Sequence, residues 1–218
     1  MEIRIPLLAV VLLSVLGGQC GFGVPTLKHA NLRYLPQPNI TIRDQVGDAS
    51  ALAGDCPGGC VRFGWYDIKE VRGYDLDDGI AFAIQLSGSL PRFFEDFAVY
   101  IDVDGVCSRI GANLNSREAA FSAGYEYALG YFSYGLRARA LLVDLSADDT
   151  WYIGPQRVAH WSRGDTSYFE ATWEQLGGKR ESISFMVVVM ARNEFGCSYV
   201  RDLAPDRGIG TLEVSTES

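Results

Sequence analysis

Apolar and polar residues alternate along much of the chain after residue 61. Every second residue from Ile80 to Leu86 is large and apolar, and the same period returns from Phe97 to Val103. A period of two indicates a β-strand that buries one face and leaves the other polar. Both stretches are therefore predicted to be half-buried strands.

Similar patterns continue toward the C-terminus. Further strands are predicted at residues 125–132, 137–145, 151–158, 168–173 and 210–214. Residues 184–191 (SFMVVVMA) are apolar on both faces, as in the central strand of a packed sheet. A helix is indicated only at residues 116–123, and Gly, Asp and Ser turns separate the strands. About nine to ten strands without a fixed repeat predict an all-β chain, an antiparallel β-sandwich of jelly-roll or immunoglobulin-like type.

The N-terminus carries a different pattern. Residues 5–16 (IPLLAVVLLSVL) form an apolar run behind Arg4, and small residues follow at once. The run is shorter than the roughly 20 apolar residues that span a membrane, and it has the layout of a secretory signal. Residues 1–23 are predicted to be a signal peptide, with a lipid or uncleaved anchor at or near Cys20 as the alternative. Residues 24–218 then form one exported domain, secreted or at the cell surface, with 24–38 irregular.

Composition narrows the partners. The chain has 19 Lys and Arg against 27 Asp and Glu, which gives a net charge of -8. No basic stripe is present to collect phosphates, so we expect no nucleic-acid binding. An anionic membrane surface would repel such a chain, so membrane contact is expected only through an N-terminal anchor.

The cysteines change meaning in an exported chain. Besides Cys20 there are four, Cys56, Cys60, Cys107 and Cys197, and four cysteines allow three pairings. We favour Cys56–Cys60 with Cys107–Cys197, because Cys56-Pro-Gly-Gly-Cys60 is flexible enough to close a tight turn. A four-thiolate zinc site and free thiols remain alternatives, although the spacing does not fit the common zinc ribbons.

A possible modification site lies near the start of the domain. Asn39-Ile40-Thr41 is an N-glycosylation acceptor, which has meaning only in an exported chain. It predicts that Asn39 lies in an exposed segment.

Acidic residues gather at the predicted strand ends. The pattern places Asp102 and Asp104 on one face at the end of a strand, followed by Gly105. Calcium takes six to eight oxygen ligands from carboxylates and carbonyls in loops. We therefore expect structural calcium, with Asp48 and Asp67 as further ligands. The alternative is that Asp before Gly simply forms turns.

Seven short motifs follow one another in a characteristic order. They are residues 44–48 (DQVGD), 66–71 (YDIKEV), 78–88 (DGIAFAIQLSG), 100–105 (YIDVDG), 124–127 (GYEY), 169–177 (FEATWEQLG) and 202–206 (DLAPD). This order resembles the secreted superfamily of DOMON-like domains and family 9 carbohydrate-binding modules, in particular the C-terminal domain of glucodextranase-type enzymes. The resemblance covers residues 40–214. It implies a β-sandwich that binds sugars, haem or other ligands, that often holds structural calcium, and that serves as an accessory module.

Aromatic side chains are the candidate ligand contacts. Sugar sites stack pyranose faces on Trp or Tyr, while polar side chains read the hydroxyl groups. We select Trp65, Trp151, Trp161, Tyr125 and Tyr127. Trp173 alternates in phase with Phe169 and is expected to pack in the core.

Catalytic motifs are missing from the sequence. It has no Gly-x-Ser-x-Gly, no His-Glu-x-x-His and no phosphate-binding glycine loop. We therefore expect a non-catalytic module that binds a saccharide or cell-surface glycan. The alternative is a structural or adhesive surface protein that assembles through edge strands, with residues 39–43 as a strand offered to a partner.

Overall fold

The computed structural model describes residues 35–47, 67–88, 95–107, 120, 123–134, 137–145, 156–192 and 198–215. These residues include twelve β-strands, β1 to β12. All strand pairs are antiparallel, and they form two sheets that face each other. The predicted all-β antiparallel sandwich is confirmed.

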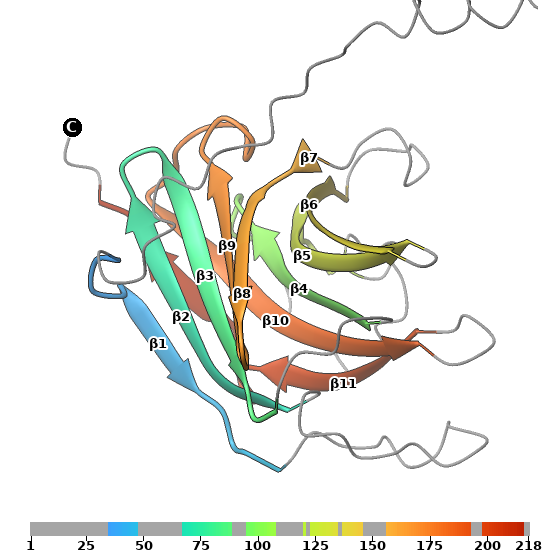
Figure 1. Cartoon of the computed structure of the whole chain (residues 1–218). Coiled ribbons are helices and arrows are strands. Elements are labelled where there is room, and N and C mark those ends of the chain that lie inside the picture. Colours follow the sequence, from blue (N-terminus) through green and yellow to red (C-terminus); the bar gives the residue numbers. More distant parts are fainter. Residues whose placement is uncertain are drawn as a thin grey trace, which may run out of the picture.

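The smaller sheet has five strands. In spatial order they are β1 (Ile40–Arg43), β2 (Ile68–Leu76), β3 (Gly79–Leu86), β9 (Thr166–Thr172) and β8 (Ala159–Arg163). In Figure 1 these strands lie side by side in this order from left to right. Strands β1 and β8 are therefore the two edges of this sheet.

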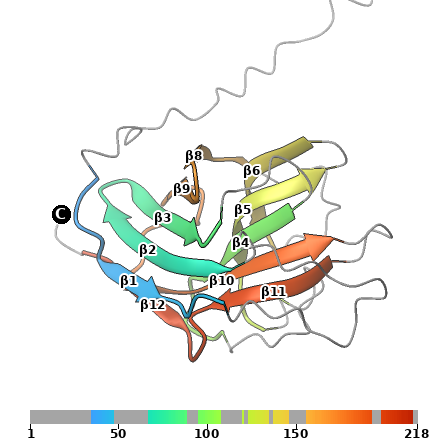
Figure 2. The ribbon, with the colours of Figure 1, turned by 60° about the horizontal axis from the view of Figure 1, so that its bottom comes forward.

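The larger sheet has seven strands. In order they are β11 (Ser198–Ala204), β10 (Ser182–Arg192), β4 (Glu95–Asp102), β5 (Tyr127–Tyr134), β6 (Arg137–Asp144) and β7 (Gln156–Arg157), and β12 (Gly210–Glu213) also pairs with β10. Figure 2 separates the two layers, with β1, β2 and β3 on one side and β4, β5, β6, β10 and β11 on the other. As the apolar pattern of residues 184–191 predicts, β10 has neighbours on both sides.

Aromatic rings from the inner faces of the two sheets form the core. Phe82 of β3 meets Phe185 of β10 with 4.8 Å between ring centroids, and Phe169 of β9 meets Phe97 of β4 at 5.4 Å. These four side chains are buried, and the rings are tilted or edge-on. Such tilted contacts are the favoured geometry of aromatic pairs. The core therefore joins the two sheets directly.

The outer faces are also partly apolar. Tyr100, Met186 and Val188 belong to a second buried cluster on the outer side of the seven-stranded sheet. Tyr74 and Tyr168 belong to a third on the outer side of the five-stranded sheet. The alternating pattern therefore predicts correctly which side chains share a face, but the outer faces are less polar than that pattern suggests.

Three strands escaped the sequence prediction, namely β2, β8 and β11. Strand β8 contains His160 and Trp161 and looks irregular in the sequence, because it is a short edge strand with only partial burial. Of the strand predicted at residues 151–158, the described residues contain β7. The predicted leader, residues 1–23, lies outside the described residues. Most of the helix expected at residues 116–123 also lies outside them. Within the described residues, no helix is long and apolar enough to cross a membrane.

The segment considered as a strand for a partner pairs within the chain itself. Strand β1 lies antiparallel to β2, with Ile40 opposite Gly73 and Arg43 opposite Glu70. It occupies an edge of its own sheet. One side of β1 is therefore already paired with β2, and only its other side could pair with a strand of another chain.

The packing of the core predicts how much stability the protein loses when a core phenylalanine is truncated. Replacing Phe82 by Ala should lower the free energy of unfolding by about 3–5 kcal/mol, because the site loses its contact with Phe185 across the sheets. Urea denaturation measures this difference. The control is Val46→Ala, whose side chain is 56% exposed and which should change stability by less than about 0.5 kcal/mol. A similar small effect for Phe82→Ala would contradict the packing described here.

Candidate functional site

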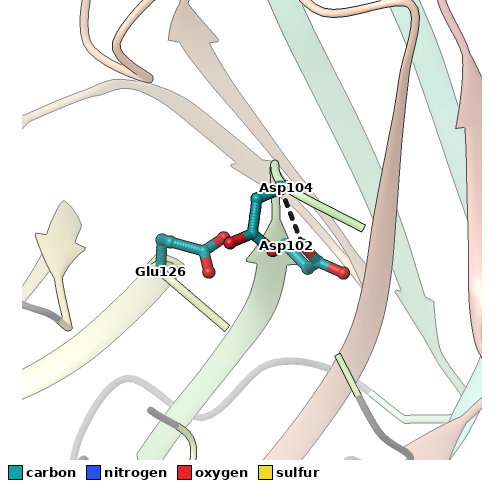
Figure 3. Close-up of side chains that lie close together, drawn as sticks. All are labelled: Asp102, Asp104 and Glu126. Carbon is teal, nitrogen blue, oxygen red and sulfur yellow. Dashed lines mark hydrogen bonds between the residues drawn. The ribbon is translucent and has the colours of Figure 1, made fainter. Parts of the chain in front are cut away.

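Three carboxylates meet at one end of the seven-stranded sheet. Asp102 ends β4, Asp104 lies in the turn that follows, and Glu126 directly precedes β5. One oxygen from each lies within 4.8 Å of the others, and Figure 3 shows Asp104 and Glu126 pointing toward each other beside Asp102. We call these three residues the acidic cluster.

Antiparallel pairing brings the cluster together. Ile101 of β4 is the register partner of Tyr127 of β5, and the Glu126 N–H donates to the Ile101 carbonyl at 3.0 Å. Ile101 faces the core, so the next residue, Asp102, faces the outer side of the sheet. The Glu126 side chain is held there by the Val103 N–H, which donates to its Oε2 at 2.8 Å.

Asp102 organises the turn after β4. Its Oδ1 accepts the N–H groups of Asp104 at 2.9 Å and Gly105 at 2.7 Å, and its Oδ2 accepts the Cys107 N–H at 2.9 Å. Burial by itself would raise the pKa of Asp102, but the hydrogen bonds from Cys107, Gly105 and Asp104 outweigh it and lower this pKa. Gly105 has a φ of 81°, which favours glycine. Asp102 thus accepts the backbone N–H groups of the turn that Asp104 and Gly105 form.

Glu126 is affected by the negative charges of the other two residues of the acidic cluster. Its pKa is raised, first by burial and then by the negative charges of Asp104 and Asp102, although the Val103 N–H opposes the shift. Like charges at this distance favour protonation or a bound cation. The donor set consists of carboxylate oxygens alone, which suits a hard cation such as calcium. Backbone carbonyls or water would have to complete its coordination.

Two of the predicted metal ligands, Asp102 and Asp104, lie in the cluster, and Asp67 does not. Asp67 precedes β2, where its carboxylate accepts the Gly47 N–H at 2.9 Å and the Ser87 hydroxyl at 2.6 Å. Asp67 thus has a separate structural role, as an acceptor that ties two loops together. The fourth predicted ligand, Asp48, lies outside the described residues.

The register of β10 shows how far Asp67 is from the cluster. Asp202 accepts the Ile68 N–H at 2.6 Å and is the partner of Val189, whereas Asp102 is the partner of Ser184. These two positions on β10 are five residues apart, which is about 17 Å along a strand. Glu126 takes the place of Asp67 as third carboxylate. The sequence reasoning missed Glu126, because only the β4–β5 register brings it to Asp102.

Cys107 is a free thiol in the structure. Cys197, the disulfide partner that we expected from the sequence, lies outside the described residues. The thiol lies against Asp102, and its pKa is raised to about 12, first by burial and then by the hydrogen bond and charge of Asp102. Its sulfur is thus engaged with the turn. The other cysteines, Cys56, Cys60 and Cys197, lie outside the described residues.

The outer face of the five-stranded sheet contains the one predicted platform tryptophan that the structure describes. Trp161 of β8 is half-buried and lies opposite Tyr168 of β9, which lies opposite Ala83 of β3, which lies opposite Arg72 of β2. We call these four residues the aromatic row. They cross four neighbouring strands on one face of the sheet.

A second row runs beside the aromatic row and consists of polar side chains. From edge to edge it contains Arg163, Thr166, Gln85, Glu70 and Arg43. We call these five residues the polar row. Glu70 forms ion pairs with Arg43, at 3.6 Å, and with Arg72 of the aromatic row, at 2.5 Å. The Gln85 amide donates to Asp165 at 2.9 Å. The face therefore combines an indole surface with paired hydrogen-bonding groups.

The two candidate tyrosines do not lie with Trp161. Tyr125 is fully buried on the outer side of the seven-stranded sheet, with its ring 6.0 Å from that of Tyr100. Tyr127 packs against the core, and its pKa is raised by burial and by the nearby Asp144 and Glu126. These places leave the ring faces of Tyr125 and Tyr127 engaged with protein.

The remaining aromatic candidates divide between core and undescribed chain. Trp173 belongs to the core cluster, as its phase with Phe169 predicts. Trp65 and Trp151 lie outside the described residues.

The predicted glycosylation site is exposed. Asn39 lies directly before β1, and its side-chain oxygen accepts the Asp75 N–H at 2.8 Å. This leaves the side-chain nitrogen, the atom that would carry a glycan, outside that hydrogen bond.

Comparison with known proteins adds no assignment. No protein-family model, no curated protein and no solved structure matches the chain. Function is therefore inferred from the residues themselves.

The hydrogen bonds of Asp102 make a prediction that does not depend on a metal. Asp102→Asn replaces one acceptor oxygen by an NH₂ group, which leaves a backbone N–H unpaired. With a metal chelator present, this change should lower the free energy of unfolding by about 1–3 kcal/mol. Chemical denaturation measures it. Since the folded pKa is lowered, the Asp102 contribution is complete above its ordinary pKa of 3.8 and is lost as the pH falls through the folded value. The variant should therefore lose less stability than the wild type in that acidic range.

The control is Asp104→Asn. Asp104 is exposed, and its Oδ1 accepts the Val106 N–H at 3.2 Å, a role that an Asn oxygen can take over. Its stability in chelator should stay within about 0.5 kcal/mol of the wild type. Equal stability of the Asp102→Asn and Asp104→Asn proteins would show that Asp102 does not organise the turn.

Proposed function

We propose that this protein is an exported, non-catalytic module that binds a saccharide on the outer face of its five-stranded sheet. One observation carries the proposal: the strand register aligns the half-buried Trp161 with Tyr168 and sets the polar row directly beside them. Stacking on an indole and hydrogen bonding to charged side chains are the two contacts that sugars need. The apolar residues 5–16 support export.

The arrangement suggests how such a ligand would lie. One pyranose face would stack on the indole of Trp161 at the sheet edge. Its hydroxyl groups would then meet Arg163 on the same strand and Thr166 and Gln85 on the next two strands. The ion pairs of Glu70 hold the side chains of Arg43 and Arg72 in place, which reduces the side-chain entropy lost on ligand binding.

The size of the face favours more than one sugar unit. The polar row crosses all five strands, which at the usual strand spacing is about 19 Å. This length exceeds a single pyranose ring. We therefore propose an oligosaccharide or a glycan chain end as the ligand, bound across the strands.

We propose further that the acidic cluster holds a structural calcium ion. Support comes from the three carboxylates within 4.8 Å of one another and from the raised pKa of Glu126, which a cation would relieve. Asp102, Asp104 and Glu126 would bind it, and the ion would neutralise the turn between β4 and β5. The cluster lies on the outer side of the seven-stranded sheet, so the ion would support the fold and would not contact the saccharide.

Calcium should raise the melting temperature. With a dissociation constant in the 10⁻⁴–10⁻³ M range of extracellular modules, about 10 mM calcium would add roughly 2 kcal/mol of stability. Differential scanning calorimetry in calcium and in chelator measures this. Glu126→Gln should abolish the increase, while Glu213→Gln, at an exposed position on β12, should retain it. An unchanged melting temperature in the wild type would remove calcium from the proposal.

Saccharide binding is tested on the mature chain, residues 24–218, by a glycan array with calcium present. Trp161→Ala should weaken a reproducible hit at least tenfold, since a tenfold loss is about 1.4 kcal/mol and truncated aromatic contacts often cost more. Arg163→Ala should weaken the same hit, because it removes a charged donor from the polar row. Isothermal titration calorimetry with the identified glycan gives the magnitudes.

The matched control is Arg207→Ala, in the exposed turn between β11 and β12. It should bind like the wild type. A blank array from a protein with a cooperative melting transition would sink the saccharide proposal, and a hit that survives Trp161→Ala would move the site elsewhere.

A further inference from the structure

His160 lies where the two sheets meet at the β8 edge. It faces inward, opposite Phe169 in the β8–β9 pairing, and its ring centroid is 5.1 Å from that of Phe169. It also lies 5.3 Å from the ring of Tyr131, which belongs to β5 in the opposite sheet. The imidazole thus contacts one aromatic ring from each sheet, and Figure 1 shows the strands β8, β9 and β5 that carry these residues. In the sequence the residue looks like part of a polar loop, so this position is a finding of the tertiary structure.

A short chain of hydroxyl groups anchors the imidazole. Its Nε2 is 2.7 Å from the Ser162 Oγ, which is 2.7 Å from the Oγ of the buried Ser167. Both serines can rotate their hydroxyl protons. The chain therefore accepts either a neutral or a protonated imidazole without losing its two hydrogen bonds. The cost of protonation lies elsewhere, in the burial of a charge.

Among the described residues, no charged group offsets that cost. Burial alone lowers the pKa of His160 to about 4, from an ordinary value of 6.5. Of the described groups that contact the ring, Ser162 on β8 and Phe169 on β9 are not titratable, and Tyr131 on β5 is a phenol. Arg163 follows on β8 but faces the outer side. The ring faces of Phe169 and Tyr131 attract a cation only weakly compared with water.

Trp161 is the next residue on the same strand. Successive side chains of a strand point to opposite faces, so His160 closes the inner side of β8 while Trp161 forms the outer platform. Strand β8 pairs only with β9 and is the edge of its sheet. Any local opening of β8 therefore moves both residues together.

We propose that His160 is a pH-sensitive latch: when neutral it holds edge strand β8 against the sandwich, and when protonated it releases β8 together with the Trp161 platform. The regulatory part of this inference rests on the proposed saccharide site, whereas the opening of β8 does not. An acidic environment would then detach a bound glycan from the module.

Amide hydrogen exchange followed by NMR tests the opening. Protection factors of the β8 amides should fall about 30-fold between pH 7.5 and pH 5, the ratio set by a pKa near 4 in the closed strand and 6.5 in the open one. Those of β1, the opposite edge of the same sheet, should stay unchanged, because opening β1 does not expose His160. Equal β8 protection at both pH values would overturn the latch.

Two variants separate the latch from general acid sensitivity. His160→Gln keeps a hydrogen-bonding side chain that does not titrate, and it should remove the pH dependence of β8 protection. His29→Gln changes the only other histidine of the chain and should leave that dependence intact. The single imidazole signal of the His29→Gln protein should not titrate above pH 6, and a midpoint near 6.5 would overturn the inference.

The link to ligand binding is measured with the glycan identified on the array. Its dissociation rate should rise between pH 7.5 and pH 5 in the wild type and stay constant in His160→Gln. A pH-independent dissociation rate in the wild type would overturn the regulatory part. If no glycan binds even at pH 7.5, the proposed function fails, while the exchange experiment still decides whether His160 holds β8.

Discussion

The contact between the inner faces of the two sheets is the interaction on which the rest of the structure depends. Phe82 meets Phe185 and Phe169 meets Phe97 between the sheets, and their burial fixes which faces of β3, β10, β9 and β4 point inward. Because side chains alternate along a strand, a residue next to one of these inner positions must face outward. Every site proposed for this protein follows from that constraint.

The acidic cluster shows how the constraint creates chemistry. Ile101 and Tyr127 turn inward, so their neighbours Asp102 and Glu126 are left side by side on the outer face. Four hydrogen bonds from backbone N–H groups to the carboxylates of Asp102 and Glu126 stabilise the negative charge there. The pKa of Glu126 is nevertheless raised. The cation site that we propose lies where the fold brings three acidic groups together and backbone N–H groups only partly offset their charge.

At the edge strand β8 the same alternation places a titratable side chain on the inner face and an indole ring on the outer face. His160 turns inward and is desolvated, while Trp161 turns outward toward the polar row. An edge strand has hydrogen bonds on one side only, so its stability depends more on side-chain packing than that of β3 or β10. The proposed binding at the Trp161 face and the proposed protonation of His160 would therefore be coupled through one strand, without any longer pathway between them.

The sequence by itself determined the all-β class, the alternating strands of the sandwich, the core position of Trp173 and the shared face of Asp102 and Asp104. These features depend on neighbours close in the chain, where a period of two is directly legible. Only the tertiary structure decided that Glu126 joins Asp102, that Asp67 lies at another end, that Cys107 stays a free thiol and that Trp161 aligns with Tyr168. Each of these depends on which strands pair and in what register, and pairing between distant segments is set by the packing of the whole core, not by local pattern.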